Sequence, residues 1–407
     1  MKRIIAFLFL IAAASCIDPY TPNLKNYNSL LVVEGLITNE NSSYKIKLSR
    51  TTGQANSISE KVADADVYII DGSGVKTHLQ NSGGGYYKTD STLFKGVVGQ
   101  NYTLQILTGD GKEYKSGQST MLPVADIDKV YYEKGEEISG INGKISPGLK
   151  IFLNSANTIG NNQYFRWTFE EVWKFKIPCP QRYICKMVLD KETYIFEQID
   201  SVREYCWKRN LSEDLITNSI LSGGANFISG QEIQFIDPVL SDRLTQEYSI
   251  LVKQYSVSQE EFDFWNNLKK AGEAGGDIFA LQPFTVMSNI HNVNNNNERV
   301  LGYFEVSGVS QKRIFITAHE LDPLSLTHYQ TDCVEIPKGP SDWPGRNLPT
   351  FYQIYYQIMN NGDYTFIRPI FNTDNTLRQL VYATNVCAIC ELTGFSTKPD
   401  FWIDLNY

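Results

Sequence analysis

The 407-residue sequence has little of what enzymes use for catalysis. Its few histidines lie in no recognisable constellation: His78, His291, His319 and His328. The pair His319-Glu320 begins like the HExxH zinc motif, but Pro323 takes the place of the second histidine and would end the required helix. No GxSxG elbow, P-loop or GxGxxG fingerprint occurs. We therefore expect no enzyme activity, no catalytic residue, no metal site and no cofactor.

Clusters of positive charge are missing as well. The sequence carries 37 Lys and Arg against 45 Asp and Glu, a formal net charge of −8. A net acidic chain without a basic cluster is a poor partner for nucleic acid or for the surface of an anionic membrane. We therefore expect no nucleic-acid partner. The sequence also lacks any apolar run of about 20 residues, the length that a membrane-spanning helix needs.

The first residues have the pattern of an export signal. Two basic residues precede an apolar run over residues 4–14, and Ala-Ala-Ser-Cys then resembles a lipoprotein cleavage site. We expect residues 1–15 to be a signal peptide and Cys16 to carry a lipid that anchors the chain to a membrane. Residues 16–28, with two prolines, would form a tether. A plain signal peptide with an incidental cysteine is the alternative.

Six cysteines follow Cys16, and an even number in an exported protein favours disulfides. They form two groups of three: Cys179, Cys185 and Cys206 in the middle of the chain, and Cys333, Cys387 and Cys390 near its end. If all six pair, at least one bridge must join the two groups because three is odd. The CxxC formed by the last two could also indicate zinc or thiol exchange. Zinc would need a second such pair or two histidines, and exchange would need a thioredoxin-like βαβ context, so we expect structural disulfides.

The first part of the chain has a β-pattern. Aromatic residues make up 13% and charged residues 20% of the sequence, a mixture that favours β-structure. Residues 29–123 contain short strand-like segments separated by turn signals. One of them places Tyr44, Ile46 and Leu48 on one face, and a Gly-Asp-Gly at residues 109–111 marks a hairpin. This spacing predicts an immunoglobulin-like β-sandwich of the fibronectin variety, because the Cys…Trp…Cys core of antibody domains is missing.

We expect residues 124–407 to form a larger β-rich domain with a few helices, which makes the whole chain mainly β. Strand candidates lie at residues 164–169, 233–236, 248–257, 300–306 and 313–317. A helix is expected after Ser258, which forms a capping box with Glu261. Apolar residues then recur at intervals of three and would pack the helix on a sheet: Phe262, Trp265, Leu268 and Ala271.

Several segments resemble a known family. They are residues 16–20 (CIDPY), 31–39 (LVVEGLITN), 65–69 (ADVYI), 99–117, 121–124 (MLPV), 248–257 (YSILVKQYSV), 300–304 (VLGYF) and the helix with Phe264-Trp265. Through them the chain resembles Bacteroidetes-type lipoproteins that are built around a domain of unknown function and are often encoded beside TonB-dependent outer-membrane transporters. The resemblance implies an outer-membrane location, at the cell surface or on the periplasmic leaflet. It also implies a large β-barrel protein as neighbour, and it offers no catalytic residues.

Two functions fit these features. The first is a lipid-anchored accessory protein held against an outer-membrane β-barrel, either a TonB-dependent transporter or the assembly machinery. Trp343, in a Pro/Gly-rich loop, is the candidate partner contact, with packing on its own domain as an equal alternative. The second is a free-standing surface lipoprotein that binds a ligand or glycan through exposed aromatic side chains. Four further tryptophans are available, although core packing explains most of them more simply: Trp167, Trp173, Trp207 and Trp402.

Overall fold

The structure is a computed structural model that describes residues 29–52, 59–138, 143–156, 163–188, 193–220, 227–274, 286–326, 329, 331–343 and 347–403. The predicted signal peptide (1–15), Cys16 and the tether (16–28) lie outside these residues. Strands make up 50% and helices 13% of the structure, which confirms the prediction of a mainly β fold. Within the described residues, no helix is long and apolar enough to cross a membrane.

The chain divides into two compact units. Unit 1 consists of Met1–Val124 and Ser256–Val309, and unit 2 of Ala125–Tyr255 and Ser310–Tyr407. The expected boundary after residue 123 therefore coincides closely with the end of the first segment of unit 1. The expectation that residues 124–407 form one domain needs a correction, because Ser256–Val309 clusters with unit 1.

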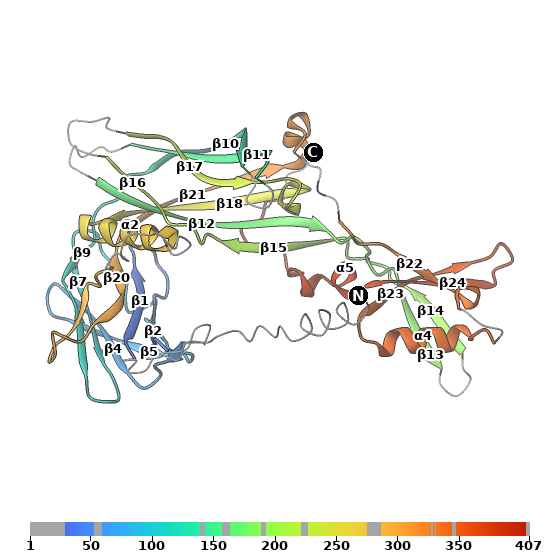
Figure 1. The fold of residues 1–407 in the computed structure, drawn as a ribbon, viewed down its shortest axis with the longest axis horizontal. Helices are drawn as coiled ribbons and strands as arrows, with labels where there is room; N and C mark the ends of the chain where they lie inside the picture. The colour runs from blue at the N-terminus through green and yellow to red at the C-terminus, as the bar shows by residue number, and fades with distance from the viewer. Residues whose placement is uncertain are drawn as a thin grey trace, which may run out of the picture. The chain divides into compact units, whose positions relative to one another are not determined.

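Unit 1 is built around one nearly closed sheet of eleven strands (Figure 1). The strands follow the order β19-β8-β7-β4-β5-β6-β2-β1-β20, with β3 beside β2 and β9 beside β7. Their bounds are β1 (Leu31–Ile37), β2 (Lys45–Arg50), β3 (Glu60–Lys61), β4 (Asp66–Asp71), β5 (Lys76–Asn81), β6 (Tyr86–Lys88), β7 (Asn101–Leu107), β8 (Glu113–Ser116), β9 (Ser119–Thr120), β19 (Ile290–Asn292) and β20 (Val300–Val306). The finer expectation of an immunoglobulin-like sandwich stays a prediction, and the hydrogen bonds describe one continuous path of strands.

Alternating side chains explain the core of this sheet. Tyr44, Ile46 and Leu48 are buried, as the period-two pattern predicts, whereas Lys45 between them is exposed. These side chains join those of the other strands in a single apolar cluster. A slip of one residue would turn all of them to solvent, so burial determines the register of β2.

The second segment of unit 1 closes the sheet. β20 pairs in parallel with β1, and β19 pairs with β8 at the other end of the path. Asn289 links the two ends, because its Nδ2 donates to the Phe304 carbonyl (2.9 Å) and its Oδ1 accepts from the Phe304 N–H (3.0 Å). Parallel pairing of strands that lie far apart in sequence has no local signal, which explains why this segment was expected in the second domain.

The helix of unit 1, α2 (Gln259–Ala274), begins where the capping signal predicts, since the Glu261 N–H donates to Ser258 Oγ at 3.1 Å. The expected apolar stripe is only partly correct. Phe262 and Trp265 of the stripe are half-buried, but Leu268 is 37% exposed. Phe264, which lies outside the predicted stripe, is buried against Tyr303, with ring centroids 4.6 Å apart. Residues three apart drift around a helix of 3.6 residues per turn, so four of them spread over about half of its circumference.

Unit 2 contains two sheets that share a hydrophobic core. One sheet consists of β10 (Ile127–Ile138), β11 (Ile145–Ala156) and β17 (Phe227–Ile236); the other consists of β15 (Tyr205–Leu211), β12 (Gln163–Lys176), β18 (Glu247–Val257) and β21 (Gly308–Thr317), with β16 (Ile216–Ile220) beside β12. Side chains from both sheets form one buried cluster, which includes Ile151 of β11 and Ile250 of β18. Four tryptophans are at most 9% exposed and are therefore core residues: Trp167, Trp173, Trp207 and Trp402.

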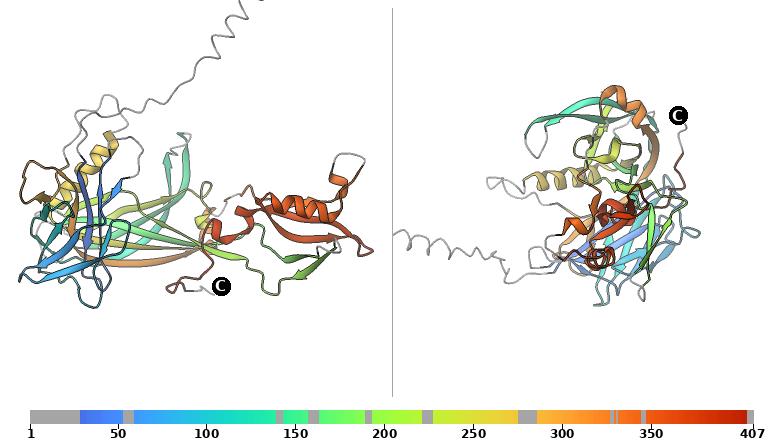
Figure 2. Two further views of the ribbon diagram at one scale, coloured as in Figure 1. Left: turned by 90° about the horizontal axis from the view of Figure 1, so that it is seen from below. Right: turned by 90° about the vertical axis from the view of Figure 1, so that its right-hand side faces the viewer.

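A smaller part of unit 2, which we call the aromatic module, has a sheet of its own. It consists of the three-stranded sheet β22 (Ile336–Lys338), β24 (Leu377–Thr384) and β23 (Tyr364–Phe371), the helix α4 (Phe351–Asn360), and the hairpin β13 (Tyr183–Val188) with β14 (Thr193–Gln198). α4 lies beside this sheet (Figure 2), and β13 contacts β23. Short turns of helix complete unit 2: η2 (Asp242–Leu244), α3 (Ala318–Leu321), η3 (Asp322–Leu324), η4 (Pro340–Asp342), α5 (Asn385–Ala388) and η5 (Cys390–Leu392).

Two disulfides cross-link unit 2: Cys206–Cys390 and Cys333–Cys387. The first joins the middle group of cysteines to the late group, and the two cysteines of the CxxC bond to different partners.

The other two disulfide candidates, Cys179 and Cys185, are free thiols, which corrects the expectation for them. The Cys179 N–H donates to the Cys387 carbonyl (3.1 Å), but the sulfur of Cys387 already bonds to Cys333. Cys185 lies opposite Phe196 in the hairpin rather than opposite another cysteine. Burial raises the pKa of Cys179 and raises that of Cys185 to about 11, so both thiols are protonated at neutral pH.

Candidate functional site

The aromatic module encloses a pocket between α4 and its three-stranded sheet. This inner pocket has a volume of about 240 Å³. Its lining is mostly aromatic and aliphatic: Ile336, Lys338, Asp342, Trp343, Ile358, Tyr364 and Tyr382. A more open cavity of about 710 Å³, the outer hollow, is lined by Trp343, Tyr356, Gln357, Ile358, Asn360, Asn361 and Tyr364. The two cavities adjoin, since Trp343, Ile358 and Tyr364 line both.

Local sequence positions α4 along these cavities. Thr350 and Gln353 form a capping box, in which each side chain accepts from the backbone N–H of the other residue at 3.2 and 3.0 Å. One face of the helix buries Ile354 and turns Ile358 toward the sheet. The opposite face presents Tyr356, which is 55% exposed. The helix therefore contributes an apolar side chain to the inner pocket and an exposed aromatic ring to the outer hollow.

A tight turn after β22 holds Trp343 between the two cavities. Asp342 Oδ2 accepts from the Gly339 N–H (2.7 Å), and the Trp343 N–H donates to the Pro340 carbonyl (3.3 Å). Gly339 is required here, because an added Cβ would lie 2.7 Å from the Arg378 carbonyl oxygen. The indole of Trp343 is half-buried and forms a wall of both cavities.

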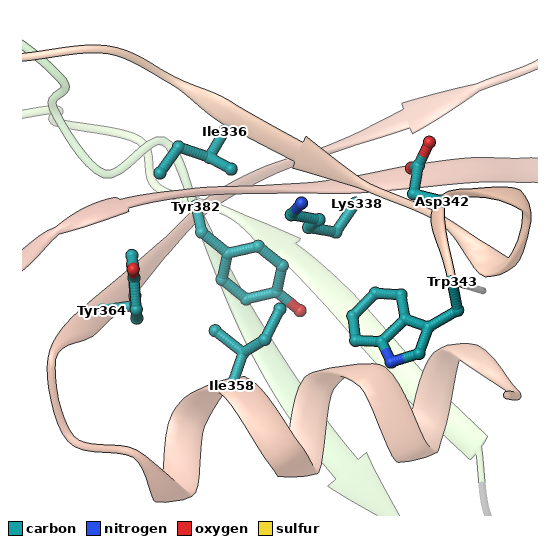
Figure 3. A pocket seen from close by; sticks show the side chains of 7 residues that line it. All are labelled: Ile336, Lys338, Asp342, Trp343, Ile358, Tyr364 and Tyr382. Carbon is teal, nitrogen blue, oxygen red and sulfur yellow. The ribbon is translucent and has the colours of Figure 1, made fainter. Parts of the chain in front are cut away.

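Tyr382 contributes an unpaired polar group to the inner pocket. It lies opposite Ile336 in the β22–β24 pair and is 1% exposed. Figure 3 shows its ring extending from the sheet toward α4, with the hydroxyl directed toward Trp343. Across the described residues, this hydroxyl has no hydrogen-bond partner. A buried hydroxyl without a partner costs about 1–3 kcal/mol. A ligand pairs with this one when the side chains that screen it move apart.

The neighbouring Tyr355 of α4 differs in this respect. Its ring centroid lies 6.5 Å from that of Tyr382, and its hydroxyl donates to the Cys185 carbonyl at 3.4 Å. Burial raises the pKa of Tyr355 to about 12 and raises the pKa of Tyr382 well above its usual range. Both phenols therefore stay protonated at neutral pH, and the Tyr382 hydroxyl can donate as well as accept a hydrogen bond.

Two charged side chains border the inner pocket. Lys338 lies at the end of β22, and its ammonium makes no hydrogen bond or ion pair with the described part of the chain. The carboxylate of Asp342 accepts from the Gly339 N–H and, at 3.3 Å, from the Gln379 amide. One formal positive and one formal negative charge cancel, so the lining does not favour a strongly charged ligand.

Another hollow of unit 2, of about 550 Å³, lies beside the Cys333–Cys387 disulfide. Most of its charged groups already have partners: Lys208 pairs with Asp242 at 2.6 Å, Asp242 also accepts from Trp173 Nε1 at 3.0 Å, and Arg182 pairs with Glu204 at 3.6 Å. We therefore favour the aromatic module as the binding site. Among the described residues, no group of three or more His, Cys, Asp and Glu side chains is placed to hold a metal ion.

Sequence reasoning identified Trp343 but missed the residues around it. The helix over residues 351–360 and the strands of the aromatic module were not among the predicted elements. One signal was available, because Thr350 and Gln353 form the same kind of capping box that predicted the helix after Ser258. No signal in the sequence indicates that the Tyr382 hydroxyl lacks a partner, since this depends on neighbours from β22 and α4.

Residues 17–313 match a family described as a domain of unknown function (DUF4249), which is more than half of the chain. β22, α4, β23 and β24 lie beyond the matched residues, so the inner pocket does as well. No curated protein matches the sequence.

Proposed function

The chain belongs to the DUF4249 family, and we propose that it is a non-catalytic, lipid-anchored binding protein of the outer membrane. The lipid on Cys16 would attach it to the cell surface or to the periplasmic leaflet, and the inner pocket would take up a ligand. The observation that carries the binding role is the Tyr382 hydroxyl, which is buried and has no partner in the described residues, on a side chain that lines an aromatic-walled cavity. Apolar walls with a few well-placed polar groups are typical of ligand sites.

The chemistry of the lining suits binding better than catalysis. General acid–base catalysis works best with a group whose pKa lies near the operating pH. Burial raises the pKa of the Tyr382 phenol well above its usual range and so moves it further from neutral pH. The carboxylate of Asp342 accepts two hydrogen bonds that hold the turn of Trp343 and therefore has a structural role.

Native mass spectrometry of the full lipidated protein, extracted gently from its own membranes, tests the binding role. We expect a bound compound that dissociates on activation, is absent from Trp343→Ala and is reduced in Tyr382→Phe. Tyr86→Ala is the matched control, because Tyr86 is a 40% exposed tyrosine of unit 1. A wild-type protein that carries nothing but detergent and lipid, or a compound that persists in both pocket variants, would contradict the proposal.

Exposed apolar side chains beside the pocket favour a second role, as an accessory protein of an outer-membrane β-barrel complex. Tyr356 is 55% exposed, and the half-buried Trp343 lines the outer hollow together with it. Exposed aromatic and apolar groups of this kind are enriched at the centres of protein interfaces. The barrel would be a TonB-dependent transporter or a component of the assembly machinery.

Affinity purification of the tagged, lipidated protein followed by mass spectrometry tests this second role. A stoichiometric β-barrel partner is expected, with reduced recovery for Tyr356→Ala and unchanged recovery for Tyr86→Ala. Recovery of the protein without any barrel would rule out the accessory role and leave ligand binding as the function.

A further inference from the structure

The combined shape and chemistry of the two cavities lead us to infer the ligand class: a neutral carbohydrate of at least two sugar units. One ring occupies the inner pocket and the next occupies the outer hollow. This inference rests on the proposed binding function and adds the identity of the ligand to it.

The size of the inner pocket limits what enters it. Its volume of about 240 Å³ is below the roughly 300–1,000 Å³ that is usual for small-molecule sites, so it accepts one ring rather than an extended molecule. The outer hollow, of about 710 Å³, is wide and open. Trp343 lines both cavities, and a ligand with two linked rings would therefore contact it from both sides.

The walls offer flat apolar surfaces on both sides of Trp343. Tyr364 lines both cavities and Tyr356 lines the outer hollow. Tyr356 also stacks on Tyr352, with ring centroids 6.4 Å apart and planes at 5°, which extends the aromatic surface along α4. A sugar ring has an apolar C–H face and a rim of hydroxyls, and its apolar face packs on aromatic rings.

The polar groups match the rim of a sugar. Each sugar hydroxyl both donates and accepts, and the Tyr382 phenol does the same. Lys338 supplies donors and Asp342 an acceptor in the inner pocket, and the outer hollow adds amide side chains: Gln357, Asn360 and Asn361. A purely aliphatic ligand would leave the Tyr382 hydroxyl unpaired, and a strongly charged ligand of either sign would face a like charge, that of Asp342 or that of Lys338.

An array of neutral and acidic glycans, with a peptide array beside it, tests this assignment on the full lipidated protein in detergent. Hits are then measured by calorimetry as a series from the monosaccharide to the hexasaccharide. We expect neutral oligosaccharides to bind and to gain affinity between one and two units.

Three variants and one control sharpen this test. Trp343→Ala should weaken binding about tenfold or more, and Tyr382→Phe about three- to tenfold, the equivalent of one hydrogen bond. Tyr356→Ala should weaken the disaccharide and leave the monosaccharide unchanged. Tyr86→Ala in unit 1 should change neither. Tyr382→Phe removes a single oxygen atom, so it keeps the test decisive even if Trp343→Ala fails to fold.

Each other result overturns a distinct part of the argument. Peptide hits without glycan hits, lost in Trp343→Ala, would overturn the carbohydrate inference and leave the binding function in place. Hits confined to acidic glycans would overturn the neutral assignment, and equal affinity for one and six units would overturn the two-ring geometry. No hit on either array, or hits unaffected by the three variants, would overturn both the inference and the pocket's binding role.

Discussion

Unit 1 and the aromatic module both bury tyrosines inside β-structure, but they differ in whether the buried hydroxyl groups have hydrogen-bond partners. In unit 1, the Tyr114 hydroxyl donates to Glu298 at 2.7 Å, and the Tyr87 hydroxyl bonds to the Val62 carbonyl at 3.0 Å. In the aromatic module, the Tyr382 hydroxyl is just as deeply buried and has no partner within the described residues. The paired hydroxyls stabilise a fold, whereas the one without a partner in the described residues costs stability.

The two regions also differ in how the chain is held together. Unit 1 has no cysteine apart from Cys16, and its sheet is closed by the β1–β20 pairing and by the side chain of Asn289. Unit 2 carries two disulfides, and one of them, Cys333–Cys387, has its sulfurs in the apolar cluster beside the aromatic module. A small module with a modest core commonly needs such cross-links.

Loss of the Cys206–Cys390 disulfide should have the largest effect. It closes a loop with a sequence separation of 184 residues, so the double variant Cys206→Ser/Cys390→Ser should lower the free energy of unfolding of unit 2 by about 3–5 kcal/mol. Differential scanning calorimetry should show the transition of unit 2 at lower temperature. The transition of unit 1, which has no disulfide in its described residues, serves as internal control. Equal shifts of both transitions would contradict the difference between the units.

Removal of the Tyr114 hydroxyl should come next. Tyr114→Phe deprives the Glu298 carboxylate of a buried donor, and a hydrogen bond to a charged group contributes about 1.5–3 kcal/mol. Urea unfolding followed by fluorescence should show that loss in unit 1. Tyr86→Phe removes the hydroxyl of a 40% exposed tyrosine in the same sheet and should leave stability unchanged. Equal stability of the two variants would refute a structural role for the Tyr114 hydroxyl.

Acid should destabilise unit 1 through the same group. Burial alone would raise the pKa of Glu298, but hydrogen bonds from Tyr114, Lys112 and Asn292 outweigh it and hold the pKa below its ordinary value of 4.5. A carboxyl with a depressed pKa stabilises the fold fully above its unfolded pKa, and this contribution is lost as the pH falls through the folded pKa. Unit 1 should therefore lose stability as the pH falls below about 4.5.

Glu298→Gln tests this pH dependence, because an amide does not titrate. Unfolding free energies measured between about pH 3 and 7 should fall less steeply for the variant than for the wild-type protein. Identical slopes would show that Glu298 does not contribute to the acid sensitivity of unit 1.

The smallest effect on stability is expected at the pocket itself. Tyr382→Phe removes a hydroxyl that has no partner in the described residues, so stability should stay the same or rise by up to about 1 kcal/mol. Tyr355→Phe, which removes the hydrogen bond to the Cys185 carbonyl, should cost about 1 kcal/mol. Thermal unfolding of the two variants without ligand measures this difference. A clear loss of stability in Tyr382→Phe would mean that its hydroxyl is structural.

Local patterns predicted the parts of the fold that depend on neighbours in sequence. The alternation through Tyr44, Ile46 and Leu48 predicted which face of β2 is buried, because successive side chains of a strand point to opposite sides. The capping box at Ser258 predicted the start of α2 for an equally local reason. The buried face of α2 was less well predicted, since it depends on where Tyr303 of β20 lies.

Of the residues that line the candidate site, the sequence predicted only one. Trp343 stood out because it lies in a Pro/Gly-rich loop, and loops commonly carry binding contacts. The structure places it in the wall of both cavities. Tyr382 and Tyr356 did not stand out among 24 tyrosines. Their roles depend on the packing of α4 against the sheet, and the spacing of residues in the sequence does not predict this packing.

The sequence by itself determined the mainly β character, the faces of the regular strands, the start of α2, and the need for a bridge between the two cysteine groups if all six paired. Each of these follows from residue type, short-range periodicity or counting. Only the tertiary structure decided that β20 closes the sheet of unit 1, that Cys387 and Cys390 bond to different partners, and that the Tyr382 hydroxyl finds no partner among the described residues. These features depend on which distant groups come within bonding distance, and that is set by the packing of the whole unit.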